Sequence, residues 1–178
     1  MSPFQNAIAF PPSILGSWGD DVSYPNLAAS VAIGTPNQYR GVKVRIRKTR
    51  RIASLIWRSG GVMAGFYDVG IFTADGTIAL WTKGKTAVPA ISTTIVEAIT
   101  PVTLQAGLDY ILALAFDTAT STFAAFVTAL SSFWQREDGT ATIYSAAVQT
   151  IPDFALVAPL TLTEALSTSP PAIALRTA

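Results

Sequence analysis

The segment Tyr110–Phe116 constrains the fold most, because it is apolar on both faces of a two-residue period. One face carries Tyr110, Leu112, Leu114 and Phe116, and the other carries Ile111, Ala113 and Ala115. This pattern is typical of a central strand that is buried on both sides. The segment is short and turn signals flank it, so a buried helix is the less favoured alternative.

A second alternating segment precedes it in the chain. Val42, Val44 and Ile46 alternate with Lys43, Arg45 and Arg47, which predicts a half-buried strand with a basic outer face. The pair Asp75-Gly76 predicts a tight hairpin turn, since glycine accepts a positive φ. Further strands are predicted at Arg51–Arg58, Tyr67–Phe72, Ile78–Trp81, Thr93–Ile99, Val102–Leu104 and Ala141–Val148.

Only Thr118–Gln135 has helical spacing, from Phe123 to Trp134, and it fits a strand as well. Many short strands separated by Gly and Asp turns predict an all-β protein, an antiparallel β-sandwich. A jelly-roll-like topology is preferred because 178 residues are too many for a seven-stranded immunoglobulin domain.

This length fits one domain. We expect an extended N-terminal arm over residues 1–30, the sandwich over 31–151 and a Pro-rich C-terminal arm over 152–178. The apolar segments Phe154–Leu160 and Ile173–Leu175 are expected to dock on a neighbouring subunit, and the alternative is that they wrap their own domain.

Composition narrows the function. The chain has no Cys and no His, which excludes thiolate nucleophiles, imidazole bases and Cys/His zinc sites. Charged residues are 13% of the chain, against about 25% in an average soluble domain. The uncharged run Thr118–Gln135 is too rich in Ser and Thr to span a membrane, and the N-terminus lacks the basic region of a secretory signal. The composition therefore favours an assembly subunit whose surface is largely covered by partners.

Two segments resemble parts of a known family. The hairpin Tyr67–Thr77 and the strand Leu104–Asp117 resemble those of small β-sandwich domains in tailed-bacteriophage virion proteins, and Pro159-Leu160 matches a later "PL" segment. The resemblance covers Val31 to Leu160. It implies a structural protein located in the virion, in a tail fibre, tail tip or collar, that contacts other virion proteins and forms a homotrimer. It implies no catalytic motif and no cofactor. A capsid-decorating subunit and a glycan-binding module on the host surface are the alternatives.

The basic residues are concentrated in one region. Eight of the 12 lie in 19 positions with no acid between them: Arg40, Lys43, Arg45, Arg47, Lys48, Arg50, Arg51 and Arg58. They could form a solvated strand face that discourages edge pairing, a contact for an acidic protein partner, or a contact for a polyanion. No signature of a fold that binds nucleic acid specifically accompanies them.

Aromatic and acidic residues supply the remaining candidates. Trp18, Trp57, Trp81 and Trp134 could stack on sugars or pack in the core, and Trp81, beside a turn, is the best candidate for an exposed glycan contact. The acidic pairs that could serve catalysis are Asp20 with Asp21, Asp68 with Asp75, and Glu137 with Asp138. Asp75 and Asp138 each precede Gly and are interpreted as turn residues, and no calcium-loop pattern surrounds Asp20. We therefore expect no enzyme activity and no metal site.

Overall fold

A computed structural model describes residues 14–16, 27–46, 48–126, 143–145, 156–160 and 171–177, and all its regular elements there are β-strands. The strands are β1 (Ile14–Gly16), β2 (Leu27–Ala32), β3 (Gln38–Arg45), β4 (Arg50–Arg58), β5 (Phe66–Thr73), β6 (Ala79–Thr82), β7 (Thr86–Ala87), β8 (Thr94–Leu104), β9 (Asp109–Phe116), β10 (Thr122–Phe126), β11 (Ile143–Ser145) and β12 (Ile173–Thr177). No helix in this part of the chain is long and apolar enough to cross a membrane.

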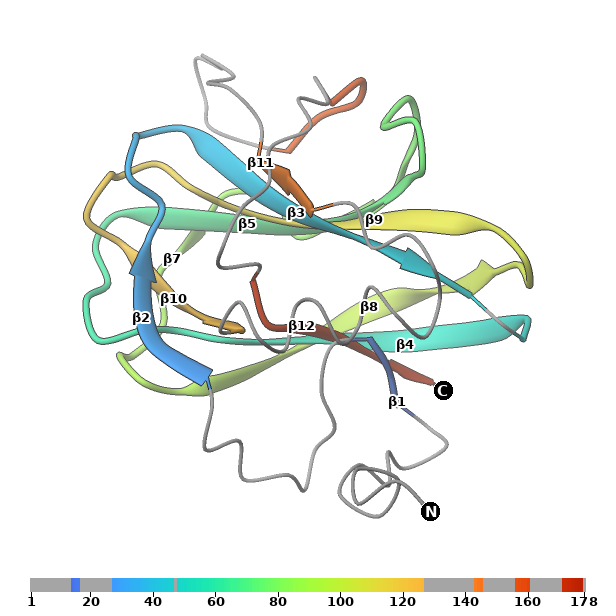
Figure 1. The fold of residues 1–178 in the computed structure, drawn as a ribbon, viewed down its shortest axis with the longest axis horizontal. Coiled ribbons are helices and arrows are strands. Elements are labelled where there is room, and N and C mark those ends of the chain that lie inside the picture. Colours follow the sequence, from blue (N-terminus) through green and yellow to red (C-terminus); the bar gives the residue numbers. More distant parts are fainter. Residues whose placement is uncertain are drawn as a thin grey trace, which may run out of the picture.

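The strands form a sandwich of antiparallel sheets (Figure 1). One layer has the order β3-β9-β5-β6, with β11 added beside β3 and β7 beside β5. In the other layer β8 pairs with β4, and β2 pairs with β10. A bridge between Ser59 and Phe123 joins β4 to β10. With this bridge, the pairs β2-β10 and β4-β8 and the order β3-β9-β5-β6 follow the connectivity of a jelly roll, as the sequence predicts, although β12 lies beside most of β4.

Both chain ends contribute strands to the sandwich. β12 pairs with β4 from Ile173 opposite Trp57 to Thr177 opposite Ile52, and β1 pairs with β12. Ile173, Ala174 and Leu175 are buried in the protein's own core. The expectation that Ile173–Leu175 docks on a neighbouring subunit is therefore wrong. Among the described residues, β10 is bridged to β4 only at Ser59, and β12 pairs with the rest of that edge of β4. β1, most of β2 and β12 thus belong to the sandwich, although they lie in the ranges 1–30 and 152–178 assigned to arms.

The core lies between the two layers. Trp57 of β4 packs against Tyr67 and Phe116, with ring centroids 4.9 and 6.0 Å away, and Phe116 stacks on Phe123 at 6.4 Å. β9 is buried on both faces, which confirms its prediction as a central strand. Its inner residues join this core, including Leu112 and Leu114. The side chains of Leu112 and Leu114 therefore mark the face of this sheet that points into the core.

The outer face of β9 is covered by the segment 156–160. Leu156 and Leu160 are buried in a cluster whose other members come from three strands of the sheet: Tyr39, Phe72, Ile111, Ala113 and Ala115. Leu160 N also donates to Gly76 O at 2.9 Å. The docking expected of Phe154–Leu160 is thus wrong for residues 156–160, which wrap their own domain.

Local turn and strand signals have their expected outcomes. Asp75-Gly76 forms the turn between β5 and β6, and Gly76 has a φ of 73°. The predicted strands Thr93–Ile99 and Val102–Leu104 form one strand, β8, which continues through Pro101 because an edge strand tolerates a missing N–H donor. In the ambiguous run, Thr122–Phe126 is a strand, and residues 127–135 lie outside the described part. Of the predicted strand Ala141–Val148, the described part is β11.

Candidate functional site

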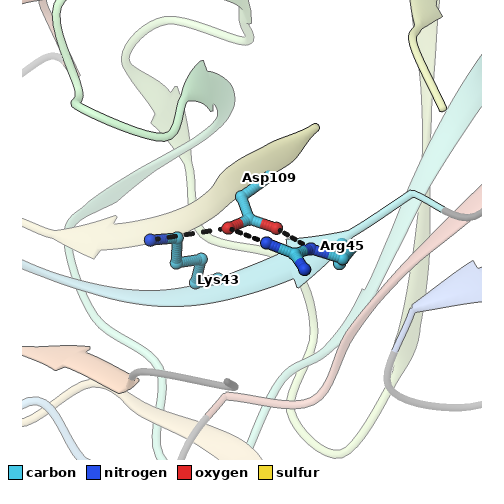
Figure 2. Close-up of polar contacts among 3 residues, drawn as sticks. All are labelled: Lys43, Arg45 and Asp109. Carbon is cyan, nitrogen blue, oxygen red and sulfur yellow. Dashed lines mark hydrogen bonds and ion pairs between the residues drawn. The ribbon is translucent and has the colours of Figure 1, made fainter. Parts of the chain in front are cut away.

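The basic face of β3 is paired with an acid from another strand. β3 lies beside β9 in a register that sets Arg45 opposite Asp109 and Lys43 opposite Ile111. Arg45 Nε donates to Asp109 Oδ1 at 2.8 Å, and its NH2 group donates to Oδ2 at 3.2 Å. Lys43 Nζ lies 3.7 Å from the same Oδ2, so one carboxylate is shared by two cations (Figure 2). Lys43, Arg45 and Asp109 together therefore carry less positive charge than the basic residues of β3 would carry alone.

This shared contact perturbs the acid. The hydrogen bonds from Arg45 lower the pKa of Asp109, with smaller contributions from the charges of Arg45 and Lys43, while partial burial opposes them. A bidentate guanidinium–carboxylate pair also fixes the orientation of both side chains. Lys43 and Arg45 thus form an ordered, half-neutralised surface on the outer face of the sheet.

Arg40 does not belong to that surface. It has the same parity on β3 as the core residue Val42, and its guanidinium lies 5.8 Å from the ring centroid of Phe123. Its NH2 group donates to Ile33 O at 3.3 Å. Burial lowers the pKa of Arg40. Arg40 therefore packs between the layers and lies on a different face from Lys43 and Arg45, although it belongs to the same predicted group of cations.

The next cations along the chain lie in the turn after β3 and at the start of β4, which belongs to the other layer. Lys48 and Arg51 are exposed at the β3–β4 turn and the start of β4. Arg50 is half-buried, and its Nε has no hydrogen-bond partner among the described residues. Arg47 lies outside the described residues. The structure thus divides the basic region between two sheets, and its contact with an acidic partner or a polyanion stays a prediction.

The two tryptophans in the described part of the chain, Trp57 and Trp81, both pack against the core. Trp57 is wholly buried in the core. Trp81 of β6 lies opposite Ile71 of β5 and is half-buried against the same core, so only part of its ring is accessible. A glycan contact at Trp81 stays a prediction, and it has less surface available than a free platform would give. Trp18 and Trp134 lie outside the described residues.

Asp68 and Asp75 do not form a catalytic pair. Asp68 is fully buried on β5, where its Oδ1 accepts from Gly84 N at 2.9 Å and its Oδ2 accepts from Leu156 N at 2.6 Å. Burial raises the pKa of Asp68, and the backbone hydrogen bonds partly oppose this effect. Asp75 is exposed in its turn, where hydrogen bonds from Thr73 and Thr77 lower its pKa to about 2. The interpretation of Asp75 as a turn residue is confirmed.

The other acidic pairs, Asp20 with Asp21 and Glu137 with Asp138, lie outside the described residues. Within the part of the chain that the structure describes, no group of acids could hold a metal ion.

Sequence reasoning missed one buried polar cluster between the layers. Glu97 of β8 is buried, accepts a hydrogen bond from the hydroxyl of Tyr67, and lies 2.9 Å from Lys83 Nζ. Burial and then the hydrogen bond with Glu97 raise the pKa of Tyr67. The available signal was a single acid inside a β-branched strand, where a buried carboxylate needs a partner. The cluster joins the two layers beside their edge strands.

Comparison with known proteins adds no relative: no family model, no curated protein and no solved structure matches this chain.

Proposed function

We propose that the chain is a non-enzymatic structural protein of a tailed-bacteriophage virion, in a tail fibre, tip or collar. The observation that supports this proposal is that the described carboxylates make structural contacts. Each acid in the described part of the chain is engaged in structure: Asp68 and Asp117 hold backbone N–H groups, Asp75 holds its turn, and Glu97 and Asp109 hold cations. This arrangement supports a protein that works through shape and contact.

The proposal of a phage protein rests on the resemblance of two segments. These two segments lie side by side in the fold. The hairpin Tyr67–Thr77 contains most of β5, and the segment Leu104–Asp117 contains all of β9. β5 and β9 pair along seven residues of each strand, from Tyr67 opposite Phe116 to Thr73 opposite Tyr110. The two segments that carry the resemblance therefore form neighbouring strands of one sheet.

A capsid-decorating subunit is the second candidate. The exposed Lys48 and Arg51 at one end of the sandwich favour it, because they would meet an acidic shell without first breaking an ion pair with Asp109.

The test is quantitative mass spectrometry of particles purified from the source, with this chain counted against the major shell protein. A ratio that matches tail components supports the proposal. A ratio that matches the head lattice replaces it with decoration. Absence from particles overturns both candidates and leaves the glycan-binding module, for which a glycan array with wild type and Trp81→Ala is the following experiment.

A further inference from the structure

Two turns at one end of the sandwich, between β3 and β4 and between β8 and β9, are joined by hydrogen bonds (right of the view in Figure 1). We name this surface the basic end, and it consists of residues 43–46, 48–51 and 103–109. Ile46 N donates to Leu108 O at 3.0 Å, and Gly107 N donates to Ile46 O at 2.7 Å. Ala106 N donates to Thr49 Oγ1 at 3.1 Å. The two turns therefore hold each other in one arrangement.

Positive charge is concentrated on this surface. Its charged residues are five cations and one acid: Lys43, Arg45, Lys48, Arg50, Arg51 and Asp109. Asp109 pairs with Lys43 and Arg45, whereas Lys48 and Arg51 are exposed and make no hydrogen bond or ion pair with the described residues. The whole chain has a net charge of only +1. A localised excess of this kind attracts and orients an anionic partner.

One aliphatic side chain is exposed among these charges. Leu108 is 53% exposed and directly precedes Asp109. The described residues of the basic end expose no aromatic ring on which a nucleic-acid base could stack. A phosphate backbone gains nothing from an aliphatic group, whereas protein interfaces bury such groups inside a rim of charged ones. The combination of Leu108 with unpaired cations therefore favours a protein partner over a nucleic acid.

We propose that the basic end binds a protein surface that carries carboxylates around an apolar centre. Carboxylate is the counter-ion that this end already holds, because Arg45 binds Asp109 through two hydrogen bonds. Lys48 and Arg51 meet the carboxylates of the partner, and Leu108 meets its apolar centre. The same end of a second copy is excluded as the partner, because like charges would face each other. The proposal rests on the structural role proposed above and names the chemistry of the surface that this role contacts.

The test measures binding of the full chain to fluorescently labelled polymers by anisotropy, with about 1 to about 100 μM chain. One probe is a soluble copolymer of glutamate and leucine, and the other is polyglutamate of the same length. In about 50 mM NaCl, we expect the copolymer to bind more tightly than polyglutamate. Both should bind more weakly as the salt concentration rises, because exposed charges are screened.

Lys48→Gln and Arg51→Gln each remove one exposed charge from the basic end. The matched control Lys85→Gln removes one charge at the other end, where Lys85 Nζ lies 4.6 Å from the Phe66 ring centroid. We expect each basic-end variant to raise the dissociation constant about two- to fivefold, as the loss of an exposed ion pair does, and the control to leave it unchanged.

The variant Leu108→Ser tests the apolar centre, because it leaves every charge in place. We expect it to raise the dissociation constant of the copolymer about three- to tenfold and to leave that of polyglutamate unchanged. Circular dichroism and thermal melting verify that each variant is folded. Arg51→Lys keeps the charge and should retain most of the affinity, which separates loss of charge from loss of structure.

A wild-type chain that binds neither polymer over this range overturns the proposal. So does a Lys85→Gln effect equal to that of Arg51→Gln, or a Leu108→Ser chain that still prefers the copolymer. A DNA duplex that binds more tightly than the copolymer in about 150 mM NaCl assigns the basic end to a polyphosphate and overturns the protein partner. The assay uses the isolated chain, so intact binding with absence from particles removes the virion role alone. Incorporation of a chain that binds neither polymer removes the basic-end contact alone.

Discussion

Replacement of Asp68 by alanine removes the buried carboxylate that holds the segment 156–160 to its sheet. Both oxygens are occupied, at 2.6 Å from Leu156 N and 2.9 Å from Gly84 N. A hydrogen bond to a charged group contributes about 1.5–3 kcal/mol, so the two bonds together contribute about 3–6 kcal/mol. Burial outweighs these bonds for the ionised form, since the folded-state pKa of Asp68 is raised despite them. The substitution destabilises the protein chiefly because it leaves the N–H groups of Leu156 and Gly84 without an acceptor, which costs about 1–3 kcal/mol each. We expect the free energy of unfolding to fall by about 2–4 kcal/mol.

The pH dependence of this contribution has a definite sign. The folded-state pKa of Asp68 is raised above the ordinary value of 3.8, so the folded protein binds the proton more tightly than the unfolded chain. The stabilisation associated with that proton is present below pH 3.8 and is lost as the pH rises through the folded-state pKa. Asp68→Asn has no such titration. The difference in stability between wild type and this variant therefore changes over that window.

Urea unfolding of wild type, Asp68→Ala and Asp68→Asn measures the stability change, and hydrogen exchange measures the segment directly. The Leu156 amide should exchange faster in Asp68→Ala. The Leu160 amide, bound to Gly76 O, should change less. Asp75→Asn is the control, because it alters an exposed carboxylate in the turn that follows the same strand. A loss below about 0.5 kcal/mol with unchanged exchange at Leu156 would refute the argument.

Three further predictions follow from the described contacts. Asp109→Asn should lower the free energy of unfolding by about 1 kcal/mol or less, with the loss shrinking in 1 M salt, because exposed ion pairs are weak and screened; an effect independent of salt in urea titrations would contradict this. NMR titration should give the Asp75 carboxyl a pKa of about 2, whereas a value near 3.8 would mean that its turn hydrogen bonds do not form in solution. Trp81→Ala should lower the free energy of unfolding by about 1–3 kcal/mol in chemical denaturation, since the ring packs on the core, and a neutral result would restore Trp81 as a free platform.

The sequence predicts those parts of the fold that depend on local chemistry. Asp75-Gly76 specifies its turn, because glycine accepts the positive φ found there. The two-sided apolar pattern of Tyr110–Phe116 identifies a central strand, because only a sheet covered on both faces buries every residue of it. The face to which Lys43 points follows from alternation along one strand. In each case the pattern that carries the prediction lies within a few residues of the chain.

Contacts between distant segments were beyond such reasoning. Asp109 meets Arg45 across 64 positions, and Leu156 meets Asp68 across 88. Nothing in either neighbourhood indicates the other, because a carboxylate near a turn has the same local pattern whether it faces water or a cation. The inward direction of Arg40, by contrast, follows from its sharing the parity of Val42, although its contacts with Ile33 O and the Phe123 ring do not.

The many apolar side chains of this chain lie in two kinds of environment in the structure. Part of it covers the protein itself, because Leu156 and Leu160 bury the outer face of a sheet that a simple sandwich would leave to solvent. This use accounts for side chains that the composition alone assigned to partners. Val62 and Ile91 have no such cover from the described residues and remain about half exposed on a backbone fixed by hydrogen bonds. These side chains are the part of the apolar composition that the described part of the domain leaves in contact with solvent.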